Sequence, residues 1–506
     1  MNNIRLLYKC NRGHNIKIIK HIMSKYNINI LHFTAVIENK YKKTKNINAE
    51  LNDLNVNLIS HEKAIRCDYS DYAKGLLIPL NIDIFNQMKP YESQIISSIY
   101  RWRFSDYVTL QQEYIEHLKF WYWYLVENKI NLYIDLVPHE IYTGVIYYLS
   151  KILNIKTILI HPSPVYGSFI LMEDWRESSK ETQQLYLNIK NPNMDLNYNF
   201  VNFESEKPNY WNPIFTDFLK KQELEEYPVY MKGKISKNKK INNRFILKIN
   251  KPSLEKIAKI TEWLFMKTYN LSRKTNRILH PIVNFVFSNY LESISVDSIN
   301  NEEKYIYFPL HYQPECTTSP LGDVFENQLI AIEWIICSKP KDVLLYVREH
   351  PAQNFDTNTI RYKSLKVYKR IASMHEVKFI SRNISTFELI RKSCAVATIT
   401  GTVGLEAIYK EKPVLMFGYH VHQYAPGVFP IRTLDDCSLA MEKIFKEGFK
   451  PSKRDVFFFL AALQETSVPV NYFSEKEMND IKKTNKFSDF LYAFIKKLEI
   501  CNSNSS

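Results

Sequence analysis

Residues 395–418 read AVATITGTVGLEAIYKEKPVLMFG, and this stretch decides the fold class. An apolar run ends in the turn TGTVG (residues 400–404), a segment with helical spacing follows over 405–411, and a second apolar run covers 413–417. A strand, a helix and a strand in this order predict a parallel βαβ unit with a right-handed crossover. The chain has only 11 glycines in 506 residues, so two glycines three positions apart indicate a turn that requires them.

The TGTVG turn has the composition of an anion-binding turn. Gly401 and Gly404 allow φ > 0 and a close approach of a ligand to the backbone. The N–H groups at the start of the following helix, near Leu405, are aligned with the helix dipole, and the hydroxyls of Thr400 and Thr402 add donors. The turn therefore predicts a phosphate site, with a tight turn that binds nothing as the alternative.

Glu406 lies in the first turn of the predicted helix. Its carboxylate is placed either to bond ribose hydroxyls, as acidic residues do in nucleotide-binding α/β folds, or simply to stabilise the helix start electrostatically.

A histidine follows another apolar run of the same domain. Residues 343–347 predict a strand, and Arg348-Glu349-His350-Pro351 come directly after it. Because the carboxyl ends of parallel strands meet at one edge of a sheet, we expect His350 and the TGTVG turn to lie at the same edge. An imidazole there can bond a phosphate oxygen and stabilise charge on a departing nucleotide. A surface histidine after a strand is the alternative.

The alternation of strands and helices divides the chain into domains. A strand over 130–136, a helix over 141–152 and a strand over 156–161 predict a second βαβ unit, and the alternation returns at residue 304. We therefore predict an α/β protein with two Rossmann-like domains that face a cleft. The predicted segments are an N-terminal acceptor-side domain at 1–205, a basic helical connector at 206–300, a nucleotide-binding domain at 301–470, and a C-terminal helical segment at 471–506 that packs back on the first domain.

Composition limits the classes of protein to which the chain can belong. Hydrophobic residues make up 45% and charged residues 24%, as in soluble globular proteins. No apolar run approaches the roughly 20 residues that span a bilayer, and no signal peptide is evident. Seven scattered cysteines without a C-x-x-C pair argue against a disulfide framework or a zinc site. We expect a cytoplasmic protein.

The net charge of +14 reflects abundant lysine, and one stretch is especially basic. Residues 232–259 hold ten Lys or Arg and a single acid, Glu255. This stretch is either a solvated linker or a contact with an anionic membrane surface, which would place the protein on the inner face of the plasma membrane. We do not expect nucleic acid as a partner.

The motifs around residues 305–430 resemble a known family. Arg348-Glu349-His350-Pro351 together with residues 400–407 (TGTVGLEA) are similar to the capsule polysaccharide synthesis family, which includes Kdo transferases, and the His-Pro pair is shared with bacterial sialyltransferases of the GT-B fold. FPLHYQPE at 308–315 and, more weakly, Pro138-His139-Glu140 resemble further segments of such surface-carbohydrate enzymes.

The resemblance implies a GT-B glycosyltransferase of capsule or lipopolysaccharide synthesis. It would transfer a Kdo-like or sialic-acid-like sugar from a CMP donor to a glycan or glycolipid acceptor, without a further cofactor. His350 would contact the CMP phosphate. The residues expected at the donor are His311, Gln313, Glu349, His350, Pro351, Thr400, Gly401, Thr402, Val403, Gly404 and Glu406.

The catalytic carboxylate has several candidates. Asp135, His139 and Glu140 follow an N-domain strand, and each is placed to accept a proton from an acceptor hydroxyl. An acid at the start of a helix is the alternative for Glu140. Glu315 stands where the resemblance implies an aspartate nucleophile in retaining members, so both its role and the stereochemical outcome stay open. His350 would act on the leaving group.

Three competing functions use the same architecture. They are a transferase with a UDP-sugar or CDP-alditol donor, a sugar-nucleotide epimerase, and a non-catalytic nucleotide-binding component of an export complex. No acidic D-x-D pair ends a strand, and His420 and His422 have no acid or cysteine beside them in the sequence, so we predict no essential metal.

Overall fold

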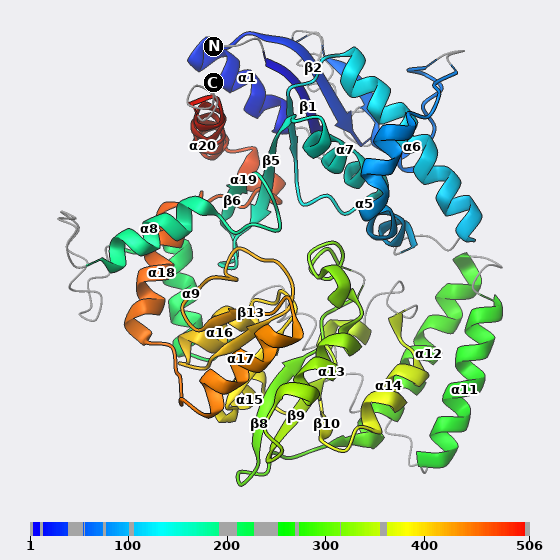
Figure 1. The fold of residues 1–506 in the computed structure, drawn as a ribbon, viewed down its shortest axis with the longest axis vertical. Helices are drawn as coiled ribbons and strands as arrows, with labels where there is room; N and C mark the ends of the chain where they lie inside the picture. The colour runs from blue at the N-terminus through cyan, green and yellow to red at the C-terminus, as the bar shows by residue number, and fades with distance from the viewer. Residues whose placement is uncertain are drawn as a thin grey trace. The chain divides into compact units, whose positions relative to one another are not determined.

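The computed structural model describes residues 4–10, 14–38, 54, 56–73, 77–100, 106–191, 210–226, 251–268, 273–313, 315–354 and 362–500. It divides into two compact units, each with its own β-sheet (Figure 1). Unit 1 comprises Met1–Leu185, Pro208–Phe215 and Ala462–Ser506. Unit 2 comprises Tyr186–Lys207 and Thr216–Ala461.

The sheet of unit 1 has the strand order β3-β2-β1-β4-β5-β6, and only β6 is antiparallel to its neighbour. Its first five strands follow the Rossmann order 3-2-1-4-5, in which the direction of chain progression reverses between β1 and β4. The strands are β1 (Ile4–Cys10), β2 (Ile30–Ile37), β3 (Asn57–Ser60), β4 (Leu132–Asp135), β5 (Lys156–Pro162) and β6 (Phe169–Met172).

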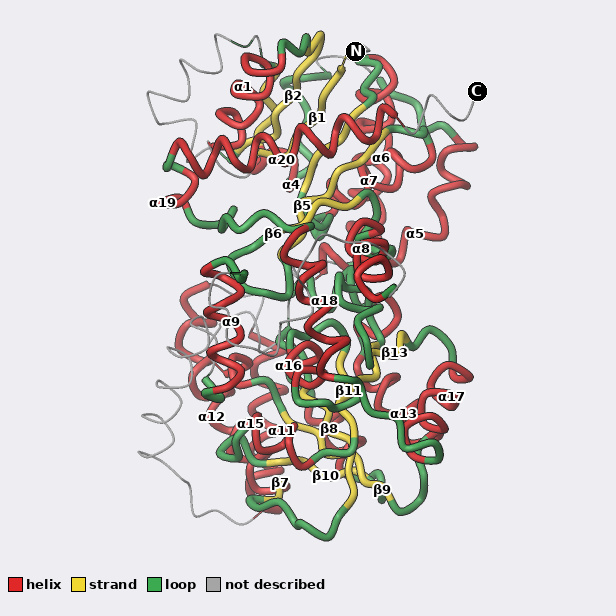
Figure 2. Tube along the Cα trace, turned by 90° about the vertical axis from the view of Figure 1, so that its left-hand side faces the viewer, coloured by secondary structure: helices red, strands yellow, loops and turns green. Residues whose placement is uncertain are grey.

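Helices from both ends of the chain cover this sheet. They are α1 (His14–Tyr26), α4 (His61–Ile65), α5 (Ile82–Tyr100), α6 (Tyr107–Glu127), α7 (Ile141–Ile152), α19 (Glu475–Met478) and α20 (Ile481–Ile500). α20 lies beside α1 over the sheet (Figure 2). Phe487 and Leu491 are fully buried there, and with Ile495 and Leu498 they form one apolar stripe along the helix.

The sheet of unit 2 has the order β13-β12-β11-β8-β9-β10-β7, and every pair is parallel. Counted from β8, its strands follow the Rossmann order 3-2-1-4-5-6, so chain progression reverses between β8 and β11. The strands are β7 (Ser295–Val296), β8 (Lys304–Pro309), β9 (Val343–Arg348), β10 (Val377–Ile380), β11 (Ala395–Thr398), β12 (Val414–Met416) and β13 (Val428–Pro430).

The helices that precede, connect and follow these strands in the sequence complete unit 2. They are α11 (Lys251–Thr268), α12 (Arg273–Ile294), α13 (Gln328–Ser338), α14 (Leu365–Ala372), α15 (Thr386–Lys392), α16 (Val403–Tyr409) and α17 (Leu434–Phe445). The chain passes from one unit to the other within three further helices, namely α8 (Lys180–Lys190), α9 (Pro213–Glu223) and α18 (Lys453–Glu465).

The predicted α/β class with two Rossmann-like sheets is confirmed. The predicted segments differ from the units at several boundaries, and two of these differences involve whole elements or strand pairing. α11 and α12, expected in a separate connector, belong to unit 2, because α12 packs against α14 and β10. Residues 462–470, expected in the nucleotide-binding domain, belong to unit 1, where Val468 pairs with Phe169. No helix in the described ranges is long and apolar enough to cross a membrane.

Candidate functional site

In unit 2 the candidate site lies at the carboxyl edge of the sheet, where β8 and β11 are neighbours. His311 follows β8, and its Nε2 accepts hydrogen bonds from the backbone N–H groups of Ile399 (3.2 Å) and Thr400 (3.3 Å). Thr398 Oγ1 lies 2.9 Å from the same nitrogen. Because a backbone N–H only donates, Nε2 carries no proton and the ring proton is on Nδ1. Burial lowers the pKa of His311 to about 4, so the ring is neutral.

The TGTVG turn follows β11 and is tied to β8 by this histidine. The hydroxyl of Thr400 donates to the carbonyl of Thr317 (2.6 Å), so it is engaged inside the loop rather than available as the ligand donor that its position suggested. The N–H of Gly401 donates to Thr398 Oγ1 (3.0 Å). Within the described ranges, the N–H groups of Thr402 and Val403 at the start of α16 have no acceptor.

The two glycines of the turn are required because there is no room for a side chain, not because the backbone adopts a positive φ. Neither has a positive φ, which corrects the reason that the sequence suggested. A Cβ on Gly401 would lie 2.9 Å from Thr398 Oγ1, and one on Gly404 would lie 3.0 Å from His422 Nε2. Both distances are shorter than ordinary contacts, so side chains from β11 and from the loop after β12 press directly on the turn.

Glu406 is buried in α16, with 9% of its surface exposed. Burial raises the pKa of its carboxyl group to about 7, although the nearby Lys410 opposes this shift. No hydrogen bond to this carboxyl group occurs within the described residues. It is therefore a carboxyl group in equilibrium between its neutral and ionised forms near pH 7, beside the TGTVG turn.

His350 follows β9, which flanks β8 on the side opposite β11. The expected placement of His350 and the TGTVG turn at one edge of the sheet is therefore observed. The ring of His350 lies 5.9 Å from the ring of Tyr312, measured between centroids. Pro351 begins a 3-10 turn (Pro351–Asn354), and His350, Glu349 and Pro351 line a narrow cavity together with Arg382.

Two predicted donor-binding residues have internal partners. The carboxylate of Glu349 accepts a hydrogen bond from the hydroxyl of Tyr368 (2.5 Å) and lies 3.7 Å from the buried Nζ of Lys363. The side chain of Gln313 donates to the carbonyl of Glu326 (3.2 Å) and accepts from the hydroxyl of Thr318 (3.1 Å). Both side chains therefore hold the loops in place, and their contact with a donor stays a prediction.

The predicted nucleophile Glu315 is exposed in the loop after β8, and it accepts a hydrogen bond from the hydroxyl of Thr317 (2.9 Å). Its catalytic role stays a prediction.

Arg432, which the sequence did not single out, organises the neighbouring loop. Its guanidinium donates to the carbonyls of Phe417 (2.9 Å) and Gly418 (3.1 Å) and to the side chain of Gln423 (2.5 Å). It also stacks on Tyr419, 4.0 Å from the ring centroid. A single arginine thus holds the residues that follow β12, and no local pattern distinguishes it from other arginines of the chain.

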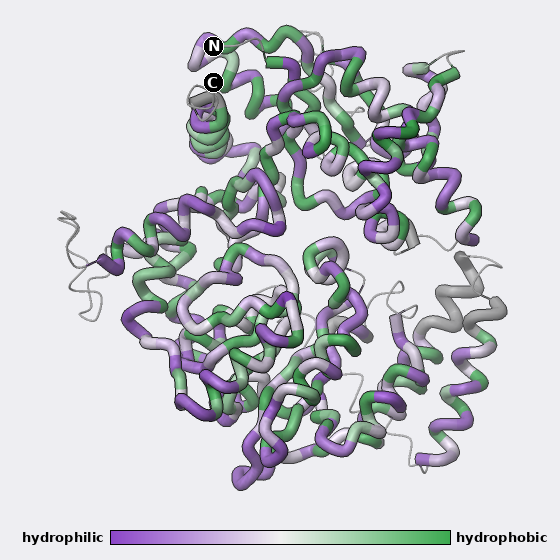
Figure 3. The backbone as a smooth tube through the Cα atoms, viewed as in Figure 1, coloured by the Kyte–Doolittle hydropathy of each residue, from purple (hydrophilic) through white to green (hydrophobic). Residues whose placement is uncertain are grey.

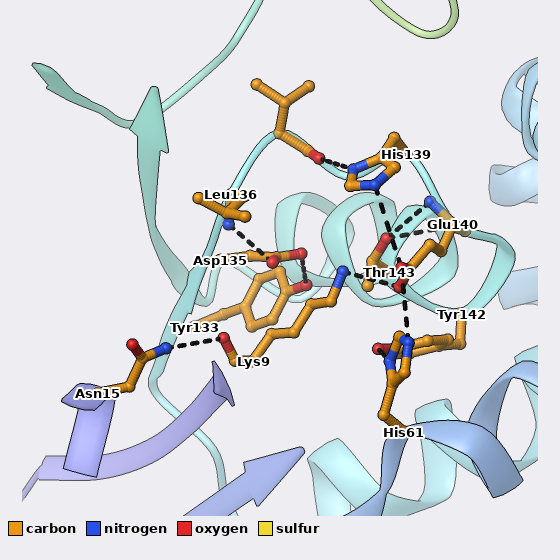
Figure 4. Close-up of polar contacts among 11 residues, drawn as sticks. Lys9, Asn15, His61, Tyr133, Asp135, Leu136, His139, Glu140, Tyr142 and Thr143 are labelled. Atoms are coloured by element: carbon orange, nitrogen blue, oxygen red, sulfur yellow. Dashed lines mark hydrogen bonds and ion pairs between the residues drawn. The ribbon is translucent and has the colours of Figure 1, made fainter. Parts of the chain in front are cut away.

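In unit 1 a buried polar cluster lies where chain progression reverses, between β1 and β4 (Figure 4). Lys9 near the end of β1 and Glu140 at the start of α7 form an ion pair with 2.7 Å between Nζ and Oε2. Desolvation lowers the pKa of Lys9, but attraction to Glu140 and Asp135 outweighs it and the pKa is raised. Desolvation likewise raises the pKa of Glu140, yet Lys9, His139 and His61 bring it down to about 2.

Asp135 ends β4 and lies deep in the same cluster, with 1% of its surface exposed. Its two oxygens accept hydrogen bonds from the hydroxyl of Tyr133 (2.6 Å) and from the N–H of Leu136 (2.7 Å). Burial raises its pKa to about 6, against the opposing effects of Lys9 and Tyr133. A carboxylate with this pKa is suited to act as a base near neutral pH. Both oxygens of Asp135, however, are enclosed by Tyr133 and Leu136.

Two histidines border Glu140. His139 Nδ1 lies 2.8 Å from the carbonyl of Val137, and since a carbonyl only accepts, this nitrogen carries the proton. The basic Nε2 is on the other side of the ring, 4.0 Å from Glu140 Oε1, and 25% of the side chain is exposed. His61, at the start of α4, lies 3.8 Å from the same oxygen and 2.7 Å from the hydroxyl of Tyr142.

The structure thus brings together the three predicted residues Asp135, His139 and Glu140. It adds Lys9 and His61, which sequence reasoning missed. Lys9 carries a recognisable signal, since a lysine within an apolar strand is expected to be buried with a partner. His61 carries none. Among the described residues, no three His, Cys, Asp or Glu side chains are grouped so that they could hold a metal ion.

Comparison with known proteins gives one family match. Residues 291–447 match the family described as capsule polysaccharide biosynthesis protein. This segment includes the whole sheet of unit 2, His311, His350 and the TGTVG turn. No curated protein matches the chain.

Solved structures give matches of low identity. The UDP-GlcNAc 2-epimerase of Methanocaldococcus jannaschii matches at 12% identity with a TM-score of 0.25, covering 92% of this chain and 100% of that chain. KpsC of Thermosulfurimonas dismutans, a beta Kdo 2,7 transferase, matches at 10% with 0.25, covering 73% and 86%. A glycosyltransferase of Rickettsia africae matches at 10% with 0.25, covering 98% and 100%. TM-scores of this size support no conclusion about function.

The resemblance inferred from the motifs at 308–315, 348–351 and 400–407 is thereby confirmed, since all three lie inside the matched segment. Residues 291–447, which carry these motifs, are therefore similar to the capsule polysaccharide biosynthesis protein family.

Proposed function

We propose that the chain is a glycosyltransferase of bacterial surface-polysaccharide synthesis that transfers a Kdo-like or sialic-acid-like sugar from a CMP donor to a glycan or glycolipid acceptor. The observation that carries this proposal is the edge of the unit 2 sheet. There the family-matched segment places His350, a neutral His311 and two N–H groups of the TGTVG turn that have no acceptor in the described part of the chain, all after neighbouring strands. We further propose that the enzyme works in the cytoplasm at the inner face of the plasma membrane.

In this proposal unit 2 binds the nucleotide. The N–H groups of Thr402 and Val403 donate to a phosphate oxygen, as backbone donors at a helix start do. His350 donates to another phosphate oxygen and stabilises the charge that develops on CMP as it leaves. Glu406 accepts a hydrogen bond from a ribose hydroxyl. All four groups belong to segments that follow β9 or β11.

Unit 1 supplies the base. Glu140 is a weak base, because its pKa is about 2 and Lys9 lies 2.7 Å away. Asp135 has both oxygens enclosed by Tyr133 and Leu136. His139 has a basic Nε2 and a partly exposed side chain. We therefore assign to His139 the role of accepting the proton of the acceptor hydroxyl.

The proposed step balances without a further reactant. The acceptor oxygen forms a bond to the anomeric carbon of the sugar, and the bond between that carbon and the CMP phosphate oxygen breaks. The acceptor proton goes to His139 Nε2, and the electron pair of the broken bond leaves with CMP. No cofactor is required in this scheme.

A thermal-shift series with CMP, UMP, CDP, UDP and GDP tests the donor assignment. A ligand that binds only the native state stabilises it by about 2.7 kcal/mol at a hundredfold excess over its dissociation constant. We expect CMP to raise the melting temperature most, and His350→Ala to remove most of that shift. His375→Ala is the matched control, because His375 is exposed in the same unit but precedes β10 at the opposite edge of the sheet.

Each other outcome has a defined meaning. A shift with UDP or CDP but not CMP would contradict the donor assignment and favour the other transferases. Turnover of a nucleotide sugar without any acceptor would favour an epimerase. Nucleotide binding without turnover of any donor and acceptor pair would favour a non-catalytic component.

A further inference from the structure

Helix α11 forms the outer layer of a helical pair in unit 2 (Figure 1). One of its faces packs against α12 and α14. Leu254 and Ala258 are buried on this face, with 2% and 0% of their surfaces exposed. Glu262 is half-buried beside them, and its carboxylate accepts a hydrogen bond from the N–H of Leu365 (3.3 Å). This side of α11 therefore fixes the helix to the unit.

The opposite face of α11 is apolar although it is exposed. Ile257 is 36% exposed, Ile260 58%, Trp263 58% and Leu264 42%. These positions recur every three or four residues, so they lie on one side of the helix. Figure 3 shows hydrophobic and hydrophilic positions close together along α11. Single exposed apolar residues are normal, but a contiguous group of large ones indicates an interaction surface.

Positive charge lies on the same helix, and Lys256 and Lys259 are next to this face. Lys251, Lys256 and Lys259 are exposed on the same helix. The acid Glu255 is neutralised by two lysines, with 3.1 Å to Lys259 and 2.6 Å to Lys369. In the sequence, the nineteen residues before Lys251 add seven Lys or Arg and no Asp or Glu.

We propose that this face of α11 binds the surface of an anionic phospholipid bilayer, with the helix parallel to the membrane plane. A helix with lysines beside Trp and large aliphatic residues is typical of interfacial binding, in which the apolar side chains enter the headgroup region and the lysines contact anionic lipid. A second copy of the chain is disfavoured as the occupant, because two such faces would bring their lysines together. The inference extends the proposed function by naming the surface at which a glycolipid acceptor would be met.

Vesicle co-sedimentation of the full chain tests this inference. We expect binding to vesicles of phosphatidylcholine mixed with phosphatidylglycerol, and little binding to phosphatidylcholine alone. The double variant Ile260→Asp/Trp263→Asp should lose most binding. Lys256→Glu/Lys259→Glu should weaken binding by roughly thirtyfold or more, since each lysine near the surface contributes about a factor of five. Leu439→Asp is the matched control, because Leu439 is an equally exposed apolar residue of α17 (58%).

The controls separate this inference from the proposed function. Each variant should keep its melting temperature and its CMP-dependent shift, because no substituted residue belongs to the proposed nucleotide site. Equal binding to neutral and anionic vesicles, or unchanged binding of the α11 variants, would overturn the inference. So would a dimer in light scattering that Ile260→Asp/Trp263→Asp dissociates. Failure of the CMP shift with normal vesicle binding would overturn only the proposed function.

Discussion

At the scale of single residues, Lys9 determines which group of unit 1 can move a proton. Desolvation raises the pKa of both acids in the cluster, Asp135 and Glu140. The charge of Lys9 outweighs this effect only for Glu140, with which it forms an ion pair. Glu140, 2.7 Å from Nζ, has its pKa lowered to about 2, whereas Asp135 has its pKa raised to about 6. Because Glu140 is held ionised and Asp135 is enclosed, the proposed mechanism assigns the proton transfer to the adjacent His139.

Substitution of His139 by Gln should lower kcat while leaving KM nearly unchanged. Gln keeps polarity and similar volume but accepts no proton, so the expected loss is about 10²- to 10⁴-fold. Steady-state kinetics with the CMP donor measures this. His32→Gln is the matched control, since His32 is a half-buried histidine on β2 of the same unit. Unchanged kcat in His139→Gln would remove His139 as the base.

Glu406 makes stability depend on pH. Its folded-state pKa is about 7 against an ordinary 4.5. Between these values the native state binds more protons than the unfolded state, so the free energy of unfolding falls as pH rises from 4.5 to 7. The side chain in Glu406→Gln is neutral at every pH. The free energy of unfolding of this variant should exceed that of the parent protein by up to roughly 3 kcal/mol at pH 8 and match it at pH 4.5.

Urea unfolding across this pH range measures the difference. The exposed Glu447→Gln serves as the control and should give a curve parallel to that of the parent protein. Equal curves for Glu406→Gln and the parent would contradict the burial of an uncompensated carboxyl group.

At the scale of elements, the TGTVG turn is shaped by its neighbours rather than by its own residues. His311 from the loop after β8 accepts N–H groups at the end of β11, and Thr400 donates to the carbonyl of Thr317. The residues after β12 close the other side, where Gly418 lies against Thr400. Three segments that end at one sheet edge thus fix one turn.

Gly418→Ala should disturb this turn. The added Cβ would lie 2.5 Å from Thr400 Cγ2 and 2.7 Å from the carbonyl oxygen of Leu321, so the backbone must shift. The expected cost is about 1–3 kcal/mol, with a reduced nucleotide-dependent thermal shift. Gly144→Ala is the control, because its nearest neighbour is the movable side-chain atom Ile95 Cγ1 at 3.3 Å. Equal behaviour of the two variants would show that the turn tolerates displacement.

At the scale of the whole molecule, each unit has its own core, and the core of unit 1 draws on both ends of the chain. Phe487 and Leu491 of α20 are buried with Ile16 and Ile19 of α1. Unit 2 has a separate core around β8, β9 and β11. Stability within one unit can therefore change independently of stability in the other.

Leu491→Ala should loosen unit 1 selectively. Loss of a fully buried leucine costs about 2–5 kcal/mol. Amide hydrogen exchange should accelerate in α1, α20 and β1, with the amides of β8 to β12 unaffected. Leu31→Ala, at a position 48% exposed on β2, should change little. Equal acceleration in both units would show that they unfold as one.

How much the sequence could predict differs between the units. In unit 2 the predicted strands and helices near 343–347, 387–392, 395–400 and 405–411 correspond to β9, α15, β11 and α16 within a few residues. In these segments the apolar residues recur at the spacing of a strand or a helix, and a few consecutive residues are enough to recognise the pattern. β1, β2 and β3 escaped prediction, because polar and charged residues interrupt them and their parallel neighbours lie far along the chain.

The sequence by itself determined the α/β class, the resemblance to the capsule polysaccharide biosynthesis family and the residues that gather at the carboxyl edge of the unit 2 sheet, because these depend on local periodicity and on short motifs after strands. Only the tertiary structure decided that Lys9 pairs with Glu140, that His311 is neutral and that Thr400 and Glu349 have internal partners. These facts depend on strand order and burial, which bring into contact residues that lie from 19 to 131 positions apart in the sequence. Protonation follows from that contact, and no local pattern contains it.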